Sequence, residues 1–158
     1  MNEFINELVE ISTRKKTFLE KIALATKIQF EAIEKNDLNE LDKLIDEKQK
    51  YIDEINILDN DFELIFEKIK DISGLSKLGD VLKSNDDLFI GLKTKIADIL
   101  KVIEEIKNIE NINSKKLSEQ KNEIGKKMRE LSKGKLAQKS YLGEPMVPPN
   151  PAFIDKKK

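Results

Sequence analysis

Carboxylates and lysines are almost the only side chains in this sequence that could do chemistry. The 158 residues include 30 acidic and 29 basic side chains but neither histidine nor cysteine. Histidine is the usual general base at neutral pH and the commonest metal ligand, and redox or disulfide sites need cysteine. A pair of metals held by glutamates in a helical bundle would also need Glu-x-x-His motifs. The composition therefore argues against metal and redox sites.

The carboxylates themselves form no catalytic pattern. Asp46 and Glu47 stand beside Lys48 on what reads as a polar helix face. The burial that shifts a carboxylate pKa for acid–base work is not predicted there. The stretch Gly74–Gly79 lacks the spacing and the preceding strand of a phosphate-binding loop. We therefore predict that the protein is not an enzyme and has no catalytic residues, no metal and no cofactor.

Charge is distributed unevenly along the chain. Residues 31–71 carry 14 acids and six bases, whereas residues 114–139 carry nine bases and three acids. Solvated faces of neighbouring helices explain this best, and a basic end that seats an acidic partner or nucleic acid is the alternative. Arg14 and Arg129 are the only arginines, and no aromatic side chains interleave the basic stretch to stack on bases. We predict no nucleic-acid partner.

The stretch Asn36–Phe62 contains the clearest helix boundary in the sequence and the start of the helix that follows it. Asn36 and Asp37 interrupt a long helical pattern, and Asp37 is a good N-cap for the next helix. Glu40, three residues later, completes a capping-box pattern. Behind the cap, apolar residues recur at steps of three, four and seven, which keep them on one helix face. They are Leu38, Leu41, Ile45, Ile52, Ile55, Phe62, Ile65 and Ile69.

Helical patterns also precede and follow this stretch. We predict helices over about 2–34, 38–70 and 86–121, with a connector and a short helix over 71–85. The apolar row of the last helix continues more weakly beyond residue 121. Gly125 and Gly134 each cost about 1 kcal/mol relative to alanine, so we expect fraying there. The weak row comprises Asn113, Leu117, Gln120, Ile124, Met128 and Leu131.

These elements predict an all-α fold. Residues 1–139 should form an elongated antiparallel three-helix bundle or long helical hairpin, and residues 140–158 a flexible, proline-rich C-terminal tail. The tail holds all four prolines together with apolar residues, which either bind a partner or fold back on the bundle. No apolar run reaches membrane-spanning length, and the N-terminus lacks a signal-peptide pattern. We expect a cytoplasmic protein without membrane insertion.

Polar residues interrupt the apolar seams of all three helices. They favour an adaptable assembly over a permanent coiled-coil dimer, although a structural coiled-coil protein remains the alternative, and homo-oligomerisation stays open. The interrupting residues are Lys15, Gln29, Lys48, Asn113 and Gln120.

Two segments, Leu24–Lys27 and Glu31–Gln49, resemble flagellar export chaperones of the FlgN type. Similar proteins have a first helix, a break, and a second helix with a Glu-Lys-Gln-like step, which is 47–49 here. The asparagine-rich stretch 108–113 and the tyrosine-containing tail are similar too. The FliT type is closely related, so both types stay open at this point.

The resemblance implies a function without catalysis. Such chaperones bind the C-terminal helical segments of late flagellar export substrates, keep them unassembled and bring them to the export apparatus. The substrates are hook–filament junction (hook-associated) proteins for the FlgN type and the filament cap protein for the FliT type. The resemblance places substrate contact toward the C-terminus, which here means an amphipathic partner helix on Ile124, Met128 and Leu131, with Tyr141 as an extra anchor.

Overall fold

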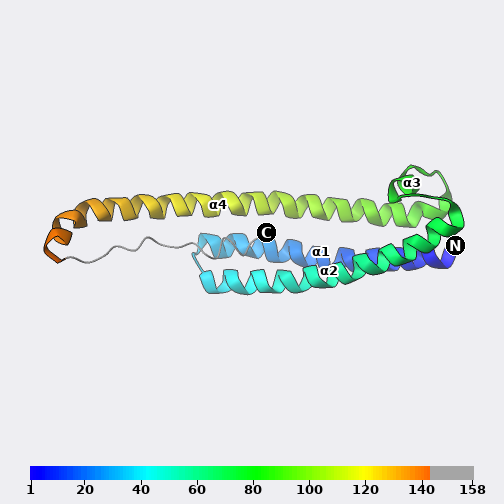
Figure 1. Ribbon diagram of the computed structural model, residues 1–158, viewed down its shortest axis with the longest axis horizontal. Helices are drawn as coiled ribbons and strands as arrows, with labels where there is room; N and C mark the ends of the chain where they lie inside the picture. The colour runs from blue at the N-terminus through cyan, green and yellow to red at the C-terminus, as the bar shows by residue number, and fades with distance from the viewer. Residues whose placement is uncertain (143–158) are drawn as a thin grey trace.

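The structure is a computed structural model that describes the fold of residues 1–142 and the side chains of residues 1–132. Its elements are α1 (Asn2–Glu34), α2 (Leu38–Ser73), α3 (Leu78–Lys83), a 3-10 turn η1 (Asp87–Phe89) and α4 (Ile90–Leu142). In Figure 1, α1 and α2 form an antiparallel hairpin, and α4 runs along it and extends far past its closed end. The predicted all-α, elongated antiparallel fold is confirmed.

The turn between α1 and α2 forms where the sequence predicted a break. Asn36 adopts a left-handed conformation with φ 54°, and the N–H groups of Asn36 and Asp37 donate to Ile33 O and Ala32 O. This is a Schellman ending. The Asp37 carboxylate accepts a hydrogen bond from the Glu40 N–H at 3.1 Å, so the predicted cap is confirmed. The other half of the capping box does not form, because the Asp37 N–H is already committed to α1.

The open end of the hairpin is closed by the connector. Gly74 ends α2 in a left-handed conformation with φ 76°, and α3 follows within the predicted connector. Val81 of α3 is fully buried against α1, α2 and the start of α4. The connector therefore serves as an apolar lid over the end of the bundle.

Three apolar clusters follow one another along the bundle, and each draws on α1, α2 and the last helix. The first, at the connector end, contains Leu8, Phe66 and Leu92. The middle one contains Ile22, Ile55 and Ile99, and the last, near the α1–α2 turn, contains Ile33, Leu41 and Leu117. Leu117 is the last buried apolar residue of α4 among the side chains described.

The expected fraying of the last helix beyond Lys121 is wrong. α4 has 53 residues and runs without a break through Gly125 and Gly134 to Leu142. At 1.5 Å per residue its length is about 80 Å. Two separated glycines weaken helix propensity by only about 1 kcal/mol each, and no proline occurs before residue 145. The predicted tail lies almost wholly outside the described residues, so its boundary remains a prediction.

Candidate partner-binding site

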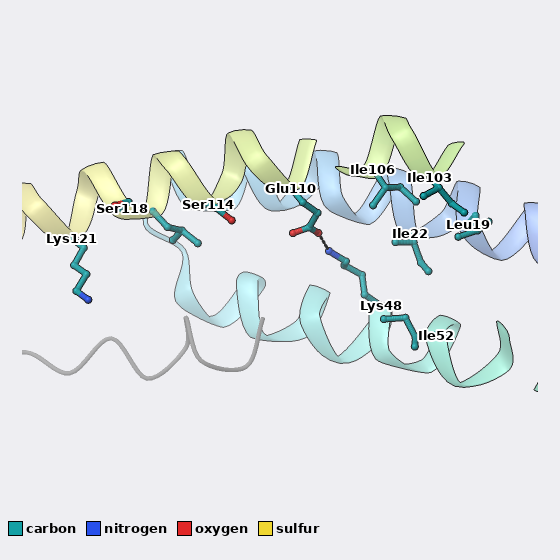
Figure 2. Close-up of a pocket in the computed structure, with 11 residues that line it drawn as sticks. Leu19, Ile22, Lys48, Ile52, Ile103, Ile106, Glu110, Ser114, Ser118 and Lys121 are labelled. Atoms are coloured by element: carbon teal, nitrogen blue, oxygen red, sulfur yellow. Dashed lines mark hydrogen bonds and ion pairs between the residues drawn. The ribbon is translucent and has the colours of Figure 1, made fainter. Parts of the chain in front are cut away.

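A groove runs between α2 and α4, with α1 as its floor. It arises because α1 packs closely along both other long helices, whereas α2 and α4 approach each other much less. Its volume is about 580 Å³. Figure 2 shows side chains from all three helices converging on it. They are Leu19, Ile22, Lys48, Ile52, Ile103, Ile106, Glu110, Ser114, Leu117, Ser118 and Lys121.

A polar bridge crosses the middle of this groove. Lys48 of α2 forms an ion pair with Glu110 of α4 and donates to Gln29 Oε1 of α1 at 2.8 Å. The Lys48 side chain is 11% exposed and that of Glu110 25%. In Figure 2 the bridge lies between an isoleucine-lined part of the groove and a part lined by Ser114 and Ser118. The groove is thus two compartments separated by a charged pair.

The polar residues that interrupt the seams make specific contacts between helices. Buried Asn113 donates to the Thr26 carbonyl at 3.0 Å, and Gln120 donates to the Ile33 carbonyl at 2.7 Å. Lys15 pairs with Asp59 across α1 and α2 at 2.7 Å. These contacts join the three helices of one chain at defined positions along their length, and the expectation of an adaptable assembly over a permanent dimer stays a prediction.

The predicted binding row lies beyond the bundle. Gln120 joins α4 to the end of α1 through its hydrogen bond to the Ile33 carbonyl, beside the α1–α2 turn. Past it, Ile124 is 47% exposed, Leu131 is 52% exposed and Met128 is partly exposed. None of the three belongs to an apolar cluster of the described residues. Tyr141 falls within α4, but its side chain is outside the described part of the chain.

The groove and this row share one face of α4. From Ile103, the groove-lining positions 106, 110, 117 and 121 follow at steps of three, four and seven. The same steps lead on to 124, 128 and 131. The sequence showed the repeat but not the groove, because the lateral spacing of helices is not encoded in the repeat of any one of them.

Metal-binding groups and membrane-spanning helices are not found in the part of the chain that the structure describes. It contains no group of three or more acidic side chains placed to hold a metal ion. None of its helices has the length and apolarity needed to cross a membrane. What the described residues offer is an open apolar groove crossed by one ion pair and continued by an exposed helix face.

This arrangement defines a class of small, all-helical proteins in which three long helices leave an open groove and one of them extends past the other two. The comparison with family models places the chain within that class: the family described as FlgN protein matches residues 1–144. The chain therefore belongs to the FlgN family and is a flagellar export chaperone. Proteins of this family bind flagellar substrate proteins, and the family is one of chaperones and not of enzymes. No curated protein and no solved structure matched the chain.

Proposed function

We propose that this chaperone binds the C-terminal amphipathic helix of a hook–filament junction protein in the cytoplasm and keeps it unassembled until export. The binding residues are Ile124, Met128 and Leu131, with Tyr141 as an additional anchor. The observation that carries the proposal is the extension of α4 past the α1–α2 turn with this apolar row exposed. Helix-in-groove recognition uses apolar anchors at this spacing.

The composition of the row suits this task. Met128 has an unbranched side chain that can repack against different partner surfaces. The surrounding stretch 114–139 is rich in lysine and keeps the extension solvated while no partner is bound. A family member whose cargo is the filament cap protein would use the same kind of helix contact, so the choice of cargo is tested separately.

The test pairs two double variants of the full chain. Met128→Ser with Leu131→Ser removes the apolar row, and Lys126→Ser with Lys127→Ser introduces the same low-propensity residue while leaving the row intact. Each is titrated by calorimetry with the C-terminal segment of a hook–filament junction protein from the same organism. We expect the first variant to bind about thirtyfold more weakly, because the two partly exposed apolar side chains together contribute about 2 kcal/mol.

Several outcomes would contradict the proposal. Wild-type affinity of the apolar variant would place the binding site elsewhere. Unfolding of that variant, seen by circular dichroism, would mean that the row stabilises the bundle. A loss confined to the lysine variant and dependent on salt would indicate an electrostatic surface. Tight binding of the cap protein's segment, but not of the junction protein's, would assign the other cargo.

A further inference from the structure

We propose that one substrate helix lies along α4 from Ile103 to Leu131, filling the α2–α4 groove and continuing over the exposed extension. This inference rests on the proposed function and extends its site by a second contact region that the sequence did not reveal. The bound helix would occupy the fourth position of a four-helix bundle whose other three members are α1, α2 and α4.

The continuity of the α4 face supports a single occupant. The groove-lining positions and the row 124–128–131 follow one repeat on one unbroken helix, with Lys121 at the junction. The face from Ile103 to Leu131 is roughly 42 Å long at 1.5 Å per residue. An amphipathic helix of about four heptads matches that length and could contact both regions at once if it supercoils gently around α4, as helices with a seven-residue repeat do.

The groove also specifies what this helix must carry. Ile52 and Ile106 line one part of the groove and suit apolar side chains, and Ser114 and Ser118 line the other. Between them the Lys48–Glu110 pair lies across the path of the helix. A bulky apolar side chain there would bury the charged pair further at a cost in desolvation. We infer a small or polar residue at the middle of the substrate's apolar stripe.

The charges of the neighbouring helices indicate which charges the two halves of the substrate helix should carry. Residues 31–71, which include most of α2, carry eight more acids than bases, and residues 114–139 of α4 carry six more bases than acids. The acidic α2 flanks the groove, whereas most of the basic stretch lies on the extension past the hairpin, so a substrate helix meets opposite charges along its length. It should therefore have basic residues in the half that fills the groove and acidic residues in the half that lies on the extension.

The decisive variant fills the groove without touching the extension. Ser114 is exposed and lines the groove, so Ser114→Trp should block the substrate while the apolar clusters stay intact. Asn122→Trp is the matched control, because Asn122 is an exposed residue of the same helix that does not line the groove. We expect Ser114→Trp to weaken binding of the junction-protein segment about tenfold or more, and Asn122→Trp to leave it unchanged.

Comparison with the Met128→Ser, Leu131→Ser variant separates this inference from the proposed function. Loss of binding in both the groove and extension variants supports one continuous surface. Loss only in the extension variant leaves the proposed function standing and overturns the inference. Loss only in the groove variant overturns the shared surface and removes the extension as the binding site.

Two other occupants are tested on the free protein. The chain has no cysteine, so Ser118→Cys gives a single site for a polarity-sensitive fluorophore at the edge of the groove. We expect the free chain to show water-exposed fluorescence that shifts to the blue when the junction-protein segment is added. A label already shielded in the free chain overturns the inference. It would assign the groove to residues 143–158 if their deletion exposes the label, or to a second copy if dilution exposes it.

Discussion

Replacing Lys48 with methionine tests the polar bridge that crosses the groove. The change keeps most of the apolar stem but removes the ammonium group that contacts Gln29 and Glu110. Taking the donor from the buried Gln29 oxygen costs about 1–3 kcal/mol. Removing the cation beside Glu110 adds about 1 kcal/mol, well below the 3–5 kcal/mol of a fully buried pair, because that side chain is 25% exposed. We expect a loss of about 3 kcal/mol.

The assay is thermal and urea unfolding followed by circular dichroism. A loss of that size lowers the Tm of a chain this long by about 6–12 °C. Lys15→Met is the matched control: its ion pair with Asp59 is more exposed, so it should cost less than about 1 kcal/mol. Lys48→Met with Glu110→Leu should recover part of the loss by removing both charges. Equal costs for the two lysines, or additive losses in the double variant, would refute this reasoning.

Three further predictions concern the ends of the helices. Asp37→Ala removes the cap on the Glu40 N–H and should lower the free energy of unfolding by about 0.5–2 kcal/mol, measured in urea; an unchanged midpoint would show that the cap contributes nothing. Gly74→Ala should cost about 1–2 kcal/mol because Gly74 has a φ of 76°, whereas Gly79→Ala, as control, should not. Hydrogen bonds from Ser76 hold the pKa of Asp80 below its ordinary 3.8. The stabilisation it gives to the start of α3 is therefore present above pH 3.8 and lost as pH falls below it. A fall in the protection of the Ser76 amide from hydrogen exchange, relative to an unstructured amide at the same pH, should reveal this loss, and protection that does not change with pH would contradict it.

The local elements could be predicted from the sequence because local rules determine them. The residues of α1 and the start of α2 follow from apolar repeats and from the Asn36–Asp37 turn. The length of α4 could not be judged correctly from its glycines. The prediction of fraying considered Gly125 and Gly134 one at a time. Helix formation is cooperative, however, so the helical residues on both sides of a weak position keep it helical.

The groove could not be predicted because it depends on the lateral arrangement of three helices. Lys48 read as part of a polar helix face and as an interruption of the seam, yet its ammonium group reaches across to another helix. Gln120 read as an interruption of the seam, yet it caps an α1 carbonyl where the hairpin ends. A sequence shows which residues share a face, whereas the distance between two faces emerges only when all the side chains pack together.

The row Ile124, Met128 and Leu131 by itself offers too little apolar surface to hold a partner. Fully burying a leucine or isoleucine is worth about 1.5–3 kcal/mol, and Ile124 and Leu131 are 47% and 52% exposed, so each contributes about 1 kcal/mol. With partly exposed Met128 the row provides roughly 3 kcal/mol, against an association cost of about 4–15 kcal/mol. Contacts elsewhere must supply the difference. Because the groove continues the same face of α4, it is the nearest source, and losing either half should therefore weaken binding steeply.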